Sequence, residues 1–176
     1  SAYRPVHSTE TALIKVTNDI LDGLDGGDES VLTLLDLSAA FDTIDHTTLL
    51  KRLSTLYGIS GPALAWFESY LCGRTQAVLV AGQMSPLVPL SFGVPQGSVL
   101  GPILFIMYTK PLSSLIQTHS VSNQSFADDT QLYKSSSPSQ THAAILAVQT
   151  CIVDVKDWMT QNKLKLNDDK TEALLF

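Results

Sequence analysis

The sequence predicts an α+β fold in which helices pack on one face of a mainly antiparallel sheet, in the split βαβ, ferredoxin-like style. Short apolar runs bounded by turn residues, typical of strands, alternate along the chain with segments of period near 3.6, typical of helices. Two of the expected strands also flank a tight turn at residues 127–129, as in an antiparallel hairpin.

Length and composition limit the class of protein. The chain has 176 residues, of which 44% are hydrophobic and 16% charged, a composition that excludes a disordered chain. The longest nearly uninterrupted apolar stretch, residues 99–108, has about half the ~20 residues that a membrane-spanning helix needs. The two cysteines are far apart and form neither a disulfide framework nor a tetrahedral metal site, so we expect an intracellular, reducing environment.

The first half of the chain begins with a helix. Ser8 is expected to cap it, and its apolar positions recur with helical spacing at Leu13, Val16, Ile20 and Leu24. Residues 31–37 follow as a strand buried on both faces, because the run is short, apolar and bounded by turns. Further helices are expected at residues 46–57 and 61–72, and further strands at 75–80 and 87–92.

The second half contains two more helices and the hairpin. Residues 99–116 are apolar around most of the helix circumference, and Pro111 is expected to end or kink that helix. The hairpin strands are residues 121–126 and 130–134. Ser137 and Gln140 predict a capping box before a long helix with the apolar stripe Ala144, Val148, Cys151, Ile152, Val155 and Met159. A strand at 164–166, a turn at 167–170 and a terminal strand follow.

Three aspartates stand where a structural role is hard to supply. Asp36 lies inside the hydrophobic strand, where an ionised carboxylate needs a partner or a metal to offset its desolvation. Asp128 and Asp129 stand together at the hairpin turn. If the sheet brings this strand beside the hairpin, each pair of carboxylates ~4 Å apart repels by about 1 kcal/mol in water and ~4 kcal/mol at an effective dielectric constant of 20.

A divalent cation removes that repulsion. Carboxylate oxygens suit Mg²⁺, and a carboxylate cluster of this kind serves in-line phosphoryl transfer by two metal ions. The alternative is that Asp128 and Asp129 merely shape the hairpin turn, and that Asp36 caps a turn that follows its strand. The residues alone leave both interpretations open.

Five segments, which stand along the chain in the order of the family's motifs, resemble those of reverse transcriptases, in particular those of non-LTR (LINE-like) retrotransposons. Residues 34–42, LLDLSAAFD, resemble the first catalytic motif, and residues 93–102, GVPQGSVLGP, the second. Residues 126–129, FADD, resemble the aromatic-Ala-Asp-Asp box. Residues 164–171 resemble the fourth motif, and residues 3–9 the segment that leaves the fingers. The resemblance implies the palm of a right-hand polymerase.

This resemblance assigns the catalytic and metal-binding roles. It implies that Asp36 and Asp128 ligate two Mg²⁺ ions, for which Mn²⁺ could substitute, and that the carbonyl of Leu37 completes the nucleotide-side ion. Asp129 is expected to be a secondary ligand or to support the cluster. Lys170 matches the lysine of the fourth motif, a candidate proton donor to pyrophosphate. The alternative for Lys170 is a solvated lysine in a polar turn.

The resemblance also assigns contacts to the substrate. Phe41 matches the aromatic steric gate, whose ring occupies the space that a ribose 2′-hydroxyl needs, although a core aromatic is the simpler interpretation. Gln96 and Gly97 are expected to line the nascent base pair, although the same loop could be only a turn before a helix. The expected contacts to dNTP and primer–template are Leu37, Ser38, Ala39, Ala40, Phe41, Gln96, Gly97 and Arg4.

The function implied is RNA-templated DNA synthesis, with an RNA template, a DNA primer and dNTPs as partners. The net charge of −6 has the wrong sign for a free-standing nucleic-acid-binding protein, but acidic residues concentrate in a palm. We therefore expect residues 1–176 to be a reverse transcriptase domain fragment, comprising the end of the fingers plus the palm. The N-terminal fingers, the thumb and an endonuclease are expected elsewhere in a polyprotein that acts in the nucleus.

Two other classes of function remain open. The first is a catalytically silent retrotransposon remnant that serves as a binding or scaffold domain. The second is a two-metal nuclease or phosphatase, which would use the same carboxylates but would need neither Phe41 nor the loop at residues 93–102.

Overall fold

The structure of the chain is a computed structural model and describes residues 6–176. The chain forms two compact units. The first unit comprises Ser1–Ala40 and Thr109–Phe176, and the second comprises Phe41–Tyr108. Within residues 6–176, no helix combines the length and the hydropathy that crossing a membrane requires.

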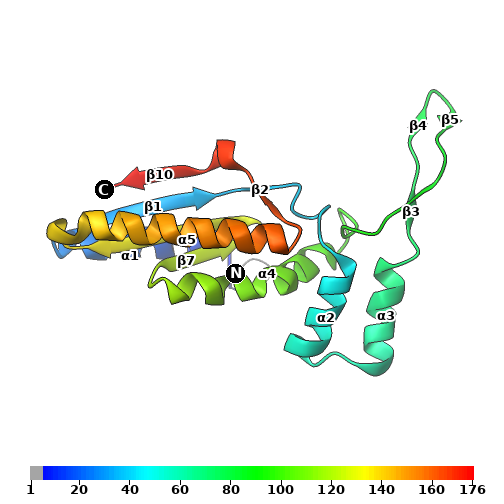
Figure 1. Ribbon diagram of the computed structural model, residues 1–176, viewed down its shortest axis with the longest axis horizontal. Coiled ribbons are helices and arrows are strands. Elements are labelled where there is room, and N and C mark those ends of the chain that lie inside the picture. Colours follow the sequence, from blue (N-terminus) through cyan, green and yellow to red (C-terminus); the bar gives the residue numbers. More distant parts are fainter. Residues whose placement is uncertain (1–5) are drawn as a thin grey trace. The chain divides into compact units, whose positions relative to one another are not determined.

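A four-stranded antiparallel sheet is the centre of the first unit (Figure 1). Its strands lie in the order β10-β1-β8-β7. Their bounds are Glu172–Leu175 for β10, Glu29–Leu35 for β1, Asp129–Ser136 for β8 and Ser122–Phe126 for β7. Strands β1 and β8 occupy the two central positions, and their side chains supply much of the core, including Val31, Leu35 and Leu132.

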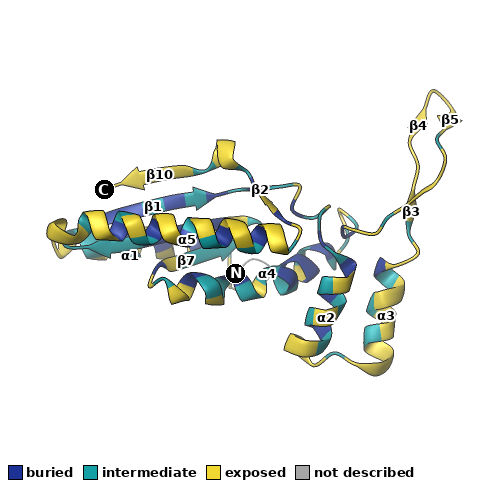
Figure 2. Ribbon diagram, viewed as in Figure 1, coloured by how far each residue is buried: buried dark blue, intermediate teal, exposed yellow. Residues whose placement is uncertain are grey.

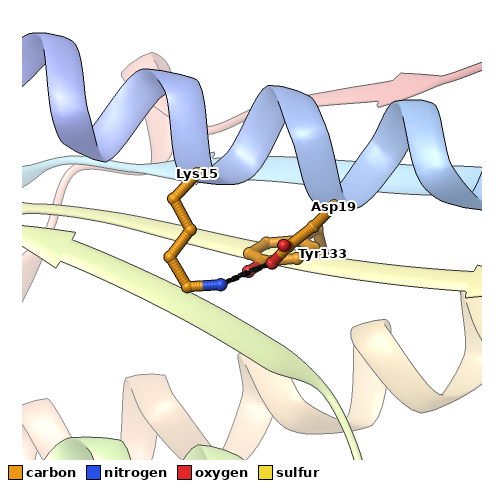
Figure 3. A network of polar contacts seen from close by, with 3 residues as sticks. All are labelled: Lys15, Asp19 and Tyr133. Carbon is orange, nitrogen blue, oxygen red and sulfur yellow. Dashed lines mark hydrogen bonds and ion pairs between the residues drawn. The ribbon is translucent and has the colours of Figure 1, made fainter.

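Helix α1, Thr9–Asp25, covers one face of this sheet. Ser8 caps it as expected, since its side chain accepts a hydrogen bond from the backbone N–H of Thr11. Val16 and Ile20 pack against Tyr133 of β8, and Lys15 and Asp19 on the same helix bond to the Tyr133 hydroxyl (Figure 3). The buried stripe and the polar contacts together attach α1 to the sheet.

Helix α5, Thr141–Gln161, lies against the strands of the same sheet and presents its apolar stripe to the core (Figure 2). Five residues of the expected stripe are buried: Ala144, Val148, Cys151, Val155 and Met159. Thr141, at the start of α5, donates a hydrogen bond of 2.5 Å to Glu29 of β1. Glu29 and Val31 lie on one face of β1, and Leu32 lies on the opposite face, which packs against α1. The predicted fold class is confirmed, with α1 as an addition on the second face.

The expected capping box before α5 is wrong. Residues Pro138–Gln140 form a turn of 3-10 helix, and the Ser137 side chain makes no capping hydrogen bond. Its hydroxyl pairs with the hydroxyl of Ser139 at 3.1 Å instead. The 3-10 turn tightens the entry to the helix, so the helix begins later than the capping pattern predicted.

The second unit contains α2, His46–Tyr57, and α3, Gly61–Leu71, both at the expected positions. The strands expected at 75–80 and 87–92 are reduced to two short ladders, in which β3 (Thr75–Gln76) pairs with β6 (Val88–Pro89) and β4 (Leu79–Val80) pairs with β5 (Gln83–Met84). All of these strand residues are exposed (Figure 2). Neither face of these two ladders is buried, so no packing against other residues stabilises longer strands here.

Helix α4, Gly101–Thr118, links the two units along the chain and continues past Pro111. Of the two expected outcomes, an end of the helix at this proline is therefore wrong, and a kink stays a prediction. A proline at 111 cannot donate to the carbonyl oxygen of Met107, and the Tyr57 hydroxyl donates to that oxygen instead, at 3.2 Å. Arg52 likewise donates to the carbonyl oxygen of Tyr108. Side chains of α2 thus satisfy carbonyls near the proline.

Candidate active site

Asp36 lies at the point where its strand changes partner. Leu35, the last residue of β1, pairs with Thr130 of β8. Leu37, the first residue of β2 (Leu37–Ser38), pairs with Leu166 of β9 (Lys165–Leu166). Asp36 stands between the two ladders, and its side chain is 27% exposed. An ionised carboxylate is therefore tolerated in an otherwise apolar strand, because this position is at the end of the sheet and partly hydrated.

Asp128 and Asp129 lie at the same end of the sheet. The hairpin turn between β7 and β8 is formed by Ala127 and Asp128, with Ala127 at φ 54°, and Asp129 begins β8 opposite Phe126. Leu35, next to Asp36, pairs with Thr130, next to Asp129, so the β1–β8 pairing brings Asp36 near Asp129, and the charge of Asp36 acts on the Asp129 carboxyl. The structure thus brings Asp36 to the Asp128–Asp129 pair, although more than ninety residues separate Asp36 from that pair in the sequence.

The electrostatics of Asp129 reflect this arrangement. Burial raises the pKa of the Asp129 carboxyl above its ordinary value, and the negative charges of Asp128 and Asp36 raise it further. The charges of both neighbours thus oppose ionisation of Asp129. The like charges of the three aspartates make this end of the sheet a place where a cation is favourable.

Lys170 and Asn167 contact the Asp36 carboxylate. The Lys170 ammonium lies 3.3 Å from Oδ2 of Asp36, although the lysine side chain is 69% exposed. The Asn167 side-chain amide donates to the same oxygen at 3.3 Å, and the backbone N–H of Asn167 donates to the carbonyl oxygen of Asp36 at 2.9 Å. The structure therefore places the candidate proton donor at the acidic cluster. It also shows a polar contact, from Asn167, to which the sequence assigned no role.

The donor chemistry of these residues fits a divalent cation such as Mg²⁺, since three carboxylates and the nearby backbone carbonyl of Leu37 all offer hard oxygen ligands. Across residues 6–176, however, no three His, Cys, Asp or Glu side chains are arranged as a ready set of metal ligands. The Asp36 side chain is instead engaged by Lys170 and Asn167. Metal binding at this cluster is therefore part of the proposal below.

Three further candidates follow Asp36 in the first unit. Ser38 pairs with Lys165 across the β2–β9 ladder. Ala39 has φ 50°, a left-handed conformation that is uncommon for a residue other than glycine, and it is exposed. Ala40 is buried. Arg4, the other candidate at this end of the sequence, lies outside the described residues.

Phe41 belongs to the second unit and is partly exposed. Its ring packs on Phe105 of α4, with centroids 5.0 Å apart, and its carbonyl oxygen accepts a hydrogen bond from Val94 at 2.9 Å. Both contacts orient the ring within this unit. They agree with a core aromatic and also with a ring whose remaining face is available to a ligand.

The loop at residues 93–97 is fixed to residues 42–46 within the same unit. Gln96 donates to both carboxylate oxygens of Asp42, at 2.9 and 3.0 Å, and His46 bonds to the carbonyl oxygen of Gly93 at 2.8 Å. Gly93 has φ 83°, and a Cβ there would lie 3.0 Å from the Asp42 carbonyl oxygen. Gly97 also has a positive φ, 74°, with no atom near the place of a Cβ. Asp42 and His46 are thus supporting residues of this loop.

Comparison with known proteins supports the motif assignment. The sequence profile of the family described as "Reverse transcriptase (RNA-dependent DNA polymerase)" matches residues 1–175. The RNA-directed DNA polymerase from mobile element jockey of Drosophila melanogaster is 29% identical over 180 residues, covering 99% of this chain. The probable RNA-directed DNA polymerase from transposon X-element of the same species is 31% identical, again over 99% of the chain. The chain spans only 19% of the length of each.

Solved structures share the fold at low sequence identity. A structure of apo telomerase from Candida tropicalis, truncated from the C-terminal domain, superposes with a TM-score of 0.73 and 17% identity, over 97% of this chain and 36% of that one. A telomerase from Candida albicans, in complex with a TWJ fragment of telomeric RNA, gives 0.69 and 16%, over 96% and 30%. The palm-like α+β fold expected from the sequence is thereby confirmed.

Proposed function

The chain belongs to the reverse transcriptase family, and from this premise we propose that it is the palm, with the end of the fingers, of an RNA-directed DNA polymerase from a non-LTR retrotransposon. The observation that carries the proposal is the meeting of Asp36, Asp128 and Asp129 at one end of the sheet. These are the residues that the family resemblance assigns to catalysis, and the pairing of β1 with β8, together with the β7–β8 turn, brings them to one end of the sheet.

The reaction proposed is nucleotidyl transfer. The 3′-hydroxyl oxygen of a DNA primer forms a bond to the α-phosphorus of a dNTP that is paired with an RNA template, and the bond to pyrophosphate breaks. Mg²⁺ or Mn²⁺, when bound, supplies positive charge for the attacking and leaving oxygens. Asp36 and Asp128 would hold two such ions with the Leu37 carbonyl, and Asp129 would support them.

Other residues have roles in binding and proton transfer. Lys170 would give a proton to the leaving pyrophosphate, and the contact of its ammonium with Asp36 supports this role. The Phe41 ring would exclude a ribose 2′-hydroxyl and so favour deoxynucleotides. Gln96 and Gly97 would line the nascent base pair, on a loop that is fixed through Asp42.

The rest of the enzyme is also part of this proposal. The chain spans about a fifth of its curated relatives. We place the N-terminal fingers, a basic thumb and an endonuclease in a parent polyprotein that acts in the nucleus. Basic regions there would hold the duplex that a palm of net charge −6 does not hold by itself.

Primer extension on an RNA template with Mg²⁺ tests the proposal, with the parent polypeptide as the enzyme. Asp128→Asn keeps the shape of the side chain and removes its charge, and it should abolish extension. Asp157→Asn, at an exposed aspartate of α5, is the matched control and should extend like the wild type. Full extension by Asp128→Asn would refute the site. A wild type without extension would favour the silent remnant, and template cleavage that Asp128→Asn abolishes would favour the nuclease.

The isolated chain of residues 1–176 should extend a primer little or not at all. The reason is that most of the positive charge that holds a primer–template duplex is expected outside it. The measurement is the same extension assay at increasing enzyme concentration. Robust synthesis by this chain alone would contradict the assignment of duplex binding to other parts of the polyprotein.

A further inference from the structure

We propose that Asn167 is a positioning residue that orients the Asp36 carboxylate for catalysis. The inference rests on the proposed function, since it concerns the same acidic cluster. It is suggested by two hydrogen bonds from one residue, Asn167, to the backbone and the side chain of another, Asp36.

The backbone bond fixes where Asp36 stands. The N–H of Asn167 donates to the carbonyl oxygen of Asp36 at 2.9 Å, one position beyond the pairing of Leu37 with Leu166. Leu37 and Leu166 are both buried, so this short ladder is anchored in the core. Asp36 therefore stands between two paired neighbours, Leu35, which pairs with β8, and Leu37, which pairs with β9, while its own carbonyl oxygen accepts the bond from Asn167.

The side-chain bond fixes where the carboxylate points. Nδ2 of Asn167 donates to Oδ2 of Asp36 at 3.3 Å, and the Lys170 ammonium lies 3.3 Å from the same oxygen. Within residues 6–176, both of these contacts reach Oδ2, so they hold the carboxylate through that one oxygen. An amide suits this role because it donates a hydrogen bond without adding charge, and so leaves the negative potential of the cluster intact.

Asn167 also begins the turn that carries Lys170. Its carbonyl oxygen accepts from the backbone N–H of Lys170 at 3.2 Å and from the Thr171 hydroxyl at 3.0 Å. One residue thus links the candidate metal ligand Asp36 with the candidate proton donor Lys170. The relative position of these two groups depends on Asn167.

The fold of the turn does not depend on the Asn167 side chain. The backbone of Asn167 has φ −91° and ψ 93°, an extended conformation that other residues adopt readily. The turn is attached to α5 by a separate ion pair of 2.7 Å between Lys156 and Asp168. Substitution of Asn167 should therefore change the orientation of Asp36 and leave the turn folded.

Nuclear magnetic resonance on the ¹⁵N-labelled 176-residue chain tests the contact without any activity. The side-chain amide signal of Asn167 should shift when Asp36 is changed to Asn, because its hydrogen-bond acceptor changes from a carboxylate to a neutral amide. The same signal should stay in place in Asp168→Asn, which alters the neighbouring ion pair instead. An Asn167 signal that does not respond to Asp36→Asn would overturn the inference.

Primer extension by the parent polypeptide tests the consequence. Asn167→Ala should lower kcat on the order of 10–100-fold, with little change in the KM for dNTP, because it misplaces a catalytic group. Asn167→Asp should lower kcat further, since it replaces the donor with a fourth negative charge. A merely structural role predicts the reverse order, because Asp is closer to Asn in shape.

The controls separate this inference from the proposed function. Asp168→Asn should change kcat less than about twofold, since Asp168 contacts Lys156 and not Asp36. A loss in Asp168→Asn equal to that in Asn167→Ala would reduce Asn167 to a structural residue of the turn. A wild type that extends no primer would overturn the proposed function, and the inference with it. An active enzyme in which Asn167→Ala keeps the wild-type kcat would overturn the inference alone.

Discussion

Replacing Asp129 by Asn should stabilise the fold at neutral pH. The pKa of the Asp129 carboxyl is raised, first by burial and then by the charges of Asp128 and Asp36, so the folded state disfavours the ionised form. The stability that protonated Asp129 contributes is fully present below its ordinary pKa of 3.8 and is lost as the pH rises through the raised value. The side-chain amide of the Asp129→Asn variant has no charge to gain, so the variant keeps that stability at neutral pH.

The magnitude follows from the two neighbouring charges. Two unit charges ~4 Å apart repel by about 1 kcal/mol in water and more at lower dielectric constant. The Asp129 residue as a whole is exposed, although its carboxyl is partly desolvated, and Asp128 and Asp36 are partly exposed, so solvent screening reduces the total to about 0.5–1 kcal/mol. For a chain of 176 residues, this corresponds to a rise in melting temperature of about 1–4 °C.

Thermal unfolding followed by circular dichroism at low ionic strength is the assay. The difference in melting temperature between Asp129→Asn and the wild type should be near zero at pH 3 and positive at pH 7. Glu172→Gln, at an exposed position of β10, is the matched control for the loss of one negative charge. Millimolar Mg²⁺ should raise the melting temperature of the wild type more than that of Asp129→Asn, because the cation relieves the same repulsion.

Two results would refute this reasoning. The first is an Asp129→Asn variant whose melting temperature differs from the wild type by the same amount at pH 3 and pH 7, since a charge effect must vanish when the carboxyl is protonated. The second is a gain at pH 7 that Glu172→Gln reproduces, since the effect would then come from net charge and not from the cluster.

Three further predictions concern other parts of the chain. Gly93→Ala should lower the free energy of unfolding, measured in urea, by about 2 kcal/mol or more, and Gly27→Ala should lower it by only about 1 kcal/mol. Both glycines have a positive φ, but only at Gly93 would a Cβ lie against a backbone oxygen, so equal losses would contradict this reasoning. Tyr133→Phe should lower the free energy of unfolding in urea by about 1–2 kcal/mol, because Lys15 and Asp19 on α1 lose their hydrogen-bond partner. An unchanged urea midpoint would show that these two bonds do not stabilise the fold. Phe41→Val should increase ribonucleotide incorporation by the parent polypeptide, and unchanged sugar selection would reject the steric gate.

Elements with strong local signals could be predicted from the sequence. The Ser8 cap, the helices at 46–57 and 61–72 and the hairpin with Asp128 and Asp129 at its turn all occur where the pattern indicated. In each case, capping groups, glycines or hydrophobic periodicity act within a few residues, so no distant contact is needed to read them. The short motifs around Asp36 and Asp128 indicated the family for the same reason.

Where local patterns failed, the surroundings of the segment decided the outcome. Pro111 does not end α4, and the Tyr57 hydroxyl bonds to a carbonyl that this proline cannot satisfy. The strands expected at 75–80 and 87–92 shorten because no other element buries them. Ser137 forms no cap because a 3-10 turn precedes α5.

The sequence by itself determined which residues could form a catalytic cluster, because carboxylates in an apolar strand and at a hairpin turn are recognisable as residue types in their local context. Only the tertiary structure decided that Asp36 lies near Asp129 and that Asn167 and Lys170 reach Asp36. The physical reason is strand register: the pairing of β1 with β8, and of β2 with β9, depends on how the whole sheet packs, and a local pattern does not specify that pairing.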